Sequence, residues 1–128
     1  MEVELVNPSE MNPPVGAYSH VARVPLQGAD LLVISGQLAA DLDNDDIVAQ
    51  AEQAFEQLRL AVESFGGSMR DIIKLTTFVT RLERREEMRA LRVKYFGDRF
   101  PASTLVQIVA LAAPGALLEI EALAVVSR

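Results

Sequence analysis

The chain of 128 residues contains no cysteine and no tryptophan, and its single histidine is His20. Without cysteine it has no thiol nucleophile, no disulfide, no thiolate-bound zinc and no iron–sulfur cluster. One histidine cannot build a histidine-rich metal site within one chain, and a Ser-His-Asp relay would have to use His20. The missing cysteines also favour a reducing compartment.

Positive charge and long apolar runs are also scarce. The chain has 12 lysines and arginines against 18 aspartates and glutamates, a net charge of −6, which argues against nucleic acid as a partner. No apolar run reaches the roughly 18–20 residues that span a bilayer. Residues 1–14 lack the basic head and apolar stretch of a signal peptide. We therefore expect a cytoplasmic protein without a membrane segment.

The size and the hydrophobic pattern predict one domain over residues 1–128. A mass of 14.0 kDa with 50% hydrophobic residues is enough for a core without disulfides or metals. Alternation of polar and apolar residues predicts strands, and apolar residues spaced three or four positions apart predict helices. Glycine or proline marks the turns between them. The expected elements are strands at 2–6, 19–26 and 31–34, a helix at 47–65, a strand at 72–79, a helix at 83–96, and strands at 104–111 and 117–126.

This order, β-β-β-α-β-α-β-β, indicates an α+β fold with both helices on one face of a mixed sheet. Such a fold leaves the other face of the sheet uncovered. The last expected strand is apolar on both sides, with Leu118 and Ile120 on one side and Leu117 and Leu123 on the other. We therefore expect a second buried surface, and oligomerisation is the simplest way to form one.

Four segments, in this order and spacing, carry a family resemblance. They are residues 16–20 (GAYSH), 33–37 (VISGQ), 74–79 (KLTTFV) and the ending that joins 100–102 (FPA) to 118–122 (LEIEA). With them the chain resembles the RidA family, also called YjgF or L-PSP, over essentially its whole length. The resemblance implies a chorismate-mutase-like fold. It also implies a homotrimer whose open sheet faces line a central barrel, with small-molecule clefts between subunits.

The resemblance also implies an activity, the hydrolysis of reactive enamines and imines such as 2-aminoacrylate to keto acids and ammonia. Water attacks a carbon that is already electrophilic, so the site has only to orient the water and hold the substrate. The reaction needs no metal, thiol or organic cofactor, and we expect none here.

Site residues are carried over from the family one at a time. Glu119 matches the glutamate that positions the water, and Ser35, Gly36 and Tyr18 match residues that meet the ligand or close the cleft. Each has a plainer alternative: a polar strand face for Glu119, a turn for Ser35 and Gly36, and the edge of the core for Tyr18. His20 lies beside this motif, and a lone histidine on a strand is more often structural.

Ser103 departs from the family pattern. The resemblance implies an arginine at this position in imine-hydrolysing members, where it binds the substrate carboxylate. Serine offers no charged fork, and one charge-assisted hydrogen bond is worth roughly 1.5–3 kcal/mol. Its loss would weaken binding of a carboxylate by about ten- to a hundred-fold or more. Leu105 stands where many relatives carry cysteine, which excludes thiol chemistry there.

A helix arginine is the candidate substitute for this missing charge. On a helical wheel Arg85, Arg89 and Arg92 fall within the apolar arc of the second helix. Arg89 matches a cleft-facing asparagine of the family, so we take it as a candidate ligand for the substrate. The alternative is that these arginines lie at a subunit boundary or pair with acids such as Glu86 and Glu87.

Three functions remain open at this stage. The first is a metal-free hydrolase similar to 2-iminobutanoate/2-iminopropanoate deaminase, with its substrate altered by Ser103. The second is a ligand-binding or regulatory trimer without catalysis. The third, an endoribonuclease or translation inhibitor, conflicts with the net charge of −6 and the single histidine.

Overall fold

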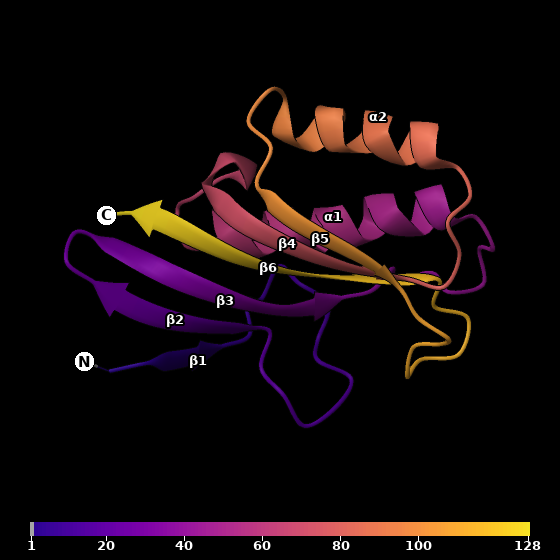
Figure 1. The fold of residues 1–128 in the computed structure, drawn as a ribbon. Coiled ribbons are helices and arrows are strands. Elements are labelled where there is room, and N and C mark those ends of the chain that lie inside the picture. The colour runs from indigo at the N-terminus through magenta and orange to yellow at the C-terminus, as the bar shows by residue number, and fades with distance from the viewer. Residues whose placement is uncertain (1) are drawn as a thin grey trace.

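The computed structural model describes residues 2–128, and its elements follow the expected order. Residues 2–128 form six strands and two α-helices, and the short 3-10 helix η1 precedes β4. Figure 1 shows how the strands and α-helices are arranged. Their bounds are β1 Glu4–Val6, β2 Val21–Leu26, β3 Ala29–Gln37, α1 Ile47–Glu63, η1 Met69–Asp71, β4 Ile72–Val79, α2 Arg85–Phe96, β5 Ala102–Gln107 and β6 Leu118–Ser127. The predicted α+β class is confirmed.

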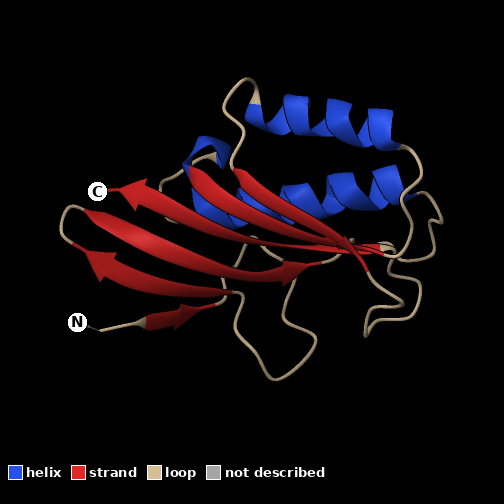
Figure 2. Ribbon diagram, viewed as in Figure 1, coloured by secondary structure: helices blue, strands red, loops and turns tan. Residues whose placement is uncertain are grey.

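The six strands form one mixed sheet in the order β1-β2-β3-β6-β4-β5. All neighbouring pairs are antiparallel except β4 and β5, which are parallel and are joined through α2. A parallel pair needs a crossover, and α2 provides it. Both helices lie on one face of the sheet, as predicted (Figure 2). The β1–β2–β3 side extends beyond the helices, and β5 forms the opposite edge (Figure 1).

The core lies between α1 and the sheet. Asp46 caps the start of α1, where its side chain accepts a hydrogen bond from the Val48 amide at 2.9 Å. The apolar face of α1 is buried, and its Phe55 stacks on Tyr95 and meets the edge of Phe96, both in α2. The sheet supplies the other side of the core through alternate residues of β6, which are Leu118, Ile120, Ala122, Ala124 and Val126.

Only β4 has the expected bounds at both ends, and β3 and β5 differ most from theirs. The β2–β3 hairpin pairs Leu26 with Ala29, so only residues 27 and 28 form the turn and β3 starts earlier than expected. Gly28 has a φ of 76°, which suits so tight a turn. The other difference is β5, expected at 104–111. It runs in register with β4 only as far as Gln107, because β4 ends at Val79 and later residues have no strand to pair with.

The face of the sheet away from the helices is largely apolar. Val33 of β3 and Ile73 of β4 are each 42% exposed, and Leu123 and Val125 of β6 are partly buried. Glu119 and Glu121 point to the same side as Leu123, because side chains alternate along a strand. Among residues 2–128, neither helix has the length and apolar character needed to cross a membrane.

Candidate functional site

The first candidate site is a cavity of about 720 Å³ at the junction of β3, β6 and the loop before β2. We call it the Glu119 cavity. Its lining includes four of the residues taken from the family pattern: Tyr18, Ser35, Gly36 and Glu119. The chain therefore brings together residues that lie up to 101 positions apart, and the order of strands explains this, since β3 and β6 are hydrogen-bonded neighbours.

A register shift in β3 shapes the floor of this cavity. Pairing with β6 is regular up to Ile34 and resumes at Gln37, so Ser35 and Gly36 lie in an irregularity of the strand. A Cβ atom placed on Gly36 would lie 2.4 Å from Oε1 of Glu119. The Glu119 side chain thus rests directly on the backbone of Gly36, and glycine is required there because any side chain would displace the carboxylate.

The Glu119 carboxylate is partly buried. Burial, with a smaller contribution from the negative charge of Glu121, raises the pKa of Glu119 above that of an ordinary glutamate. No ion pair formed among residues 2–128 includes it. A carboxylate with a raised pKa at a cavity wall can accept a proton from water more readily than an exposed one.

Both hydrogen-bond donors of Ser35, its hydroxyl and its amide, already have partners within the chain. Its hydroxyl donates to the carbonyl oxygen of Ser19 at 2.6 Å, and its amide donates to the carbonyl oxygen of His20 at 2.8 Å. What the Ser35 side chain can still offer to a ligand is an acceptor lone pair. It therefore suits an N–H or O–H group of a ligand better than a carboxylate.

His20 has a structural role in this cavity wall. Its ring is 5% exposed, and Nε2 lies 2.6 Å from the carbonyl oxygen of Asn12. A carbonyl can only accept, so Nε2 carries the proton and Nδ1 accepts from Nε2 of Gln37 at 3.0 Å. The edge-on ring of Tyr18, 5.8 Å away, packs on this histidine, and Tyr18 itself is 43% exposed.

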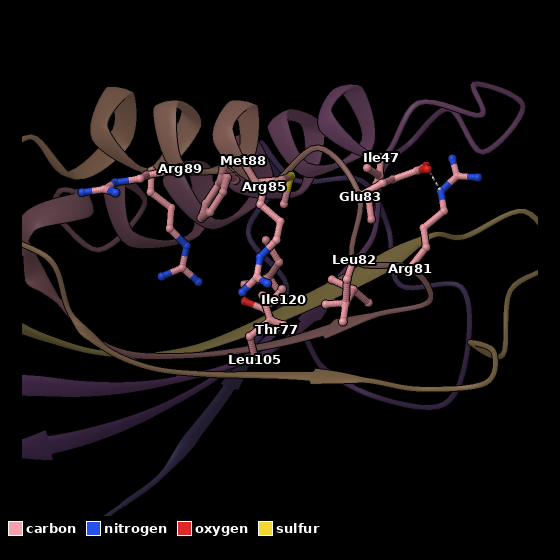
Figure 3. Close-up of a pocket in the computed structure, with 13 residues that line it drawn as sticks. Ile47, Thr77, Arg81, Leu82, Glu83, Arg85, Met88, Arg89, Leu105 and Ile120 are labelled. Atoms are coloured by element: carbon pink, nitrogen blue, oxygen red, sulfur yellow. Dashed lines mark ion pairs between the residues drawn. The ribbon is translucent and has the colours of Figure 1, made fainter.

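The second candidate site is a cavity of about 160 Å³ between α2 and the strands β4 and β5. We call it the arginine cavity. Arg85, Arg89 and Arg92 of α2 line it, and in Figure 3 Arg85 extends from the helix toward Thr77 on the sheet. Its remaining walls are mostly apolar and include Phe55, Met88, Leu105 and Ile120.

Ser103 does not line the arginine cavity, but it contacts an arginine that does, and the sequence had not singled out that arginine. Nη2 of Arg92 donates to the Ser103 hydroxyl at 3.0 Å. Arg89, the candidate ligand from the family pattern, also lines the cavity but forms no hydrogen bond to Ser103. The signal for Arg92 was present in the helical spacing of Arg85, Arg89 and Arg92. Burial lowers the pKa of Arg92 below its usual value.

The two cavities lie on opposite faces of the sheet. Ile120 lines the arginine cavity on the helix side, and the preceding Glu119 points to the other side, into the Glu119 cavity. One chain therefore separates the predicted site residues into two groups, with Glu119, Tyr18, Ser35 and Gly36 in one and Ser103 and Arg89 in the other. Among the residues from 2 to 128, no group of three or more histidines and acids is placed to hold a metal ion.

Comparison with known proteins identifies the family to which the chain is similar. A family model described as Endoribonuclease L-PSP matches residues 9–126. The 2-iminobutanoate/2-iminopropanoate deaminase of Salmonella typhimurium is 34% identical over 110 residues, covering 78% of this chain and 85% of that protein. The 3-aminoacrylate deaminase RutC of Acinetobacter baylyi is 31% identical over 130 residues, covering 97% of this chain and 98% of that protein.

A solved structure agrees with these sequence relatives. RidA from an Antarctic Psychrobacter superposes with a TM-score of 0.80 at 29% identity, covering 98% of this chain and 99% of that one. This chain therefore belongs to the Endoribonuclease L-PSP family, the family of RidA and YjgF proteins.

Proposed function

We propose that this protein hydrolyses small reactive imines or enamines to carbonyl compounds and ammonia. The observation that carries the proposal is the position of Glu119, whose partly buried carboxylate with a raised pKa rests on Gly36 inside a large cavity. The names of the Salmonella and Acinetobacter relatives, both deaminases, support the same reaction class.

The reaction follows from the chemistry of these groups. Glu119 accepts a proton from a water molecule as the oxygen of that water attacks the imine carbon, and the imine nitrogen becomes an amine on a tetrahedral carbon. Glu119 gives this proton to the nitrogen, which completes a neutral carbinolamine. It then takes the proton of the new hydroxyl group and passes it to the nitrogen as the C–N bond breaks, so that ammonia leaves and the carbonyl forms. The free lone pair of Ser35 is suited to accept a hydrogen bond from the substrate N–H.

The assembly that would perform this reaction is a homotrimer with its ligand cleft between subunits. One chain holds the Glu119 cavity and the arginine cavity on opposite faces of its sheet, so a ligand that meets both must lie between two copies. The apolar face of the sheet, with Val33 and Ile73 partly exposed, is the surface on which copies would meet.

The decisive experiment is an ammonia-release assay with imines generated in situ. Glu119→Gln removes the proton acceptor and is expected to lower kcat by about 10²–10⁴-fold, the usual contribution of general-base catalysis. The matched control is Glu86→Gln, which makes the same change at an exposed position of α2 and should keep wild-type activity. Wild-type activity in Glu119→Gln would rule out the proposed role.

Loss of activity in Glu119→Gln should not come from unfolding. Because burial raises the pKa of Glu119, its ionised form lowers stability above that pKa, and the effect vanishes below the pKa of the unfolded chain. At neutral pH Glu119→Gln should therefore be at least as stable as the wild type in urea.

A ligand-binding trimer without catalysis is the second candidate. It is favoured by Ser103, an exposed serine on β5 where the family resemblance implies an arginine that holds the substrate. For this function small carboxylates would bind in a calorimetric titration, but neither carboxylated nor neutral imines would release ammonia.

A further inference from the structure

The three α2 arginines that line the arginine cavity differ from most others in the chain, including Arg81, which also lines it but is paired with Glu83 and Asp45. The sequence contains ten arginines, and six of them form ion pairs: Arg23, Arg59, Arg70, Arg81, Arg84 and Arg128. Within residues 2–128, Arg85, Arg89 and Arg92 form no ion pair, although acidic residues outnumber basic ones by six. Three cations without an acidic partner, gathered on one cavity, leave a local excess of positive charge.

The space beneath these arginines is apolar. The cavity of about 160 Å³ is comparable with an apolar cavity of about 150 Å³ that holds benzene in another protein. Phe55, Val79, Met88 and Ile120 form much of its wall. An apolar group as large as a phenyl ring therefore fits the volume and would be removed from water there.

A buried hydroxyl provides an independent sign of a ligand. Thr77 is 2% exposed and lines the cavity, and its Oγ1 atom has no hydrogen-bond partner in the described chain. Buried polar groups almost always have partners, so an unpaired one at a cavity wall marks a place where a polar atom of a bound molecule would be favourable.

Arg92 is the arginine best prepared for an anion. It is partly buried, and Ser103 holds one of its nitrogens, Nη2, at 3.0 Å. A guanidinium has five N–H donors in a planar fork, so the others remain available for a carboxylate. Burial lowers the pKa of Arg92, and a bound anion would offset that effect. Ser103 thus acts as a positioning residue for the cation.

We propose that the arginine cavity binds a small organic acid with an apolar side chain of up to phenyl size. Arg92, aided by Arg89, binds the carboxylate, the apolar walls take the side chain, and Thr77 pairs with a further polar atom of the ligand. The cation needed by a carboxylated substrate is therefore supplied from α2. This inference rests on the proposed function only in taking the bound acid to be the substrate or product.

Three stable probes test the two halves of the proposal by calorimetry. 3-Phenylpropanoate has both the carboxylate and the ring, propanoate lacks the ring, and 3-phenylpropanamide lacks the charge. The expected order has 3-phenylpropanoate binding about ten- to a hundred-fold tighter than either of the others, because each lost feature removes one charge-assisted hydrogen bond or one buried ring. Equal affinities for the three probes would overturn the proposal.

Variants test which residues bind the carboxylate and which part of the cavity binds the ring. Arg92→Gln should weaken 3-phenylpropanoate about ten-fold or more and leave 3-phenylpropanamide unchanged. Arg92→Lys should restore part of the loss. The matched control is Arg99→Gln, since Arg99 also lacks an ion pair but does not line the cavity. Leu105→Trp, on an exposed strand, fills the cavity and should abolish the preference for the ring while propanoate binds as before.

A double variant adds a direct test of where the cation is needed. Adding Ser103→Arg to Arg92→Gln places a guanidinium on β5 in place of the one removed from α2, and affinity for 3-phenylpropanoate should return. Unchanged binding in Arg92→Gln, or a loss equal to that in Arg99→Gln, would overturn the role of Arg92.

Failure of this inference and failure of the proposed function give different results. If the probes bind as expected but no imine releases ammonia, the cavity assignment stands and the hydrolase proposal fails. If imines are hydrolysed with the same kcat/KM in the wild type, Arg92→Gln and Leu105→Trp, the hydrolase proposal stands and the cavity assignment fails.

Discussion

At the scale of single residues, Glu119 and Glu121 of β6 are the two acids on which the proposed hydrolysis depends most directly. Burial and the charge of Glu121 together raise the pKa of Glu119. Both effects disfavour the ionised form, which is the form that accepts a proton from water. Activity should therefore fall as the pH decreases through this raised pKa, at a higher pH than for an ordinary glutamate.

Glu121→Gln tests this explanation. Removing the charge of Glu121 should move the acid limb of the kcat/KM profile to lower pH, while burial keeps it above the value of an exposed glutamate. The measurement is kcat/KM against pH for the wild type, Glu121→Gln and the surface control Glu86→Gln. An acid limb that stays in place in Glu121→Gln would mean that another group controls it.

At the scale of elements, the periodicity of apolar residues predicted those features of a helix or strand that depend only on its own residues. The spacing of apolar residues placed α1 at 47–65, and the structure has it at Ile47–Glu63, with Gly66 at a φ of 82° after its end. Alternation also separated the two faces of β6 correctly. The bounds of β5 were missed because they are set by a neighbour, the end of β4 at Val79, and not by residues of β5 itself.

The same limit applies to the candidate site. The family pattern identified Tyr18, Ser35, Gly36 and Glu119, which the fold gathers in one cavity. The contact of Arg92 with Ser103 was not predicted, since it depends on the height of α2 above β5, which no local spacing encodes. The role of Gln50 was also not predicted, because its hydrogen-bond partners Gly115 and Leu117 are distant in the sequence and the spacing of apolar residues in α1 does not reveal them.

Gln50 joins two elements that are distant in the sequence. It is fully buried in α1, and its Oε1 accepts from the Leu117 amide at 2.9 Å. Its Nε2 donates to the carbonyl oxygens of Asn44 at 2.8 Å and Gly115 at 3.0 Å. The side chain therefore fixes the start of α1 to the segment that leads into β6, the strand that carries Glu119.

Gln50→Met should lower the free energy of unfolding by about 1–3 kcal/mol, because a thioether of similar size leaves three partly buried hydrogen bonds to the backbone unmade. Urea denaturation measures the change. The control is Gln53→Met, where the lost hydrogen bond comes from the exposed Asp41 amide and the effect should be small. Equal losses in the two variants would show that Gln50 does not join these elements through its hydrogen bonds.

At the scale of the whole molecule, the arrangement of the two cavities ties the proposed activity to assembly. The sheet separates Glu119 from the arginines of α2 within one chain, so a ligand can meet both only between copies. The face that would be covered has alternating apolar side chains, such as Val33, Leu123 and Val125, beside Glu119 and Glu121. Assembly and catalysis should therefore be lost together.

Val33→Glu tests this link, because it places a charge on the uncovered face at a position that is 42% exposed in the single chain. The wild type should have three times the chain mass of 14.0 kDa by light scattering, and Val33→Glu should have the mass of one chain, with ammonia release reduced in parallel. Val93→Glu is the control, since Val93 of α2 is similarly exposed, at 49%, but lies on the helix layer. A wild type with the mass of one chain, or a monomeric Val33→Glu with full activity, would contradict a site shared between copies.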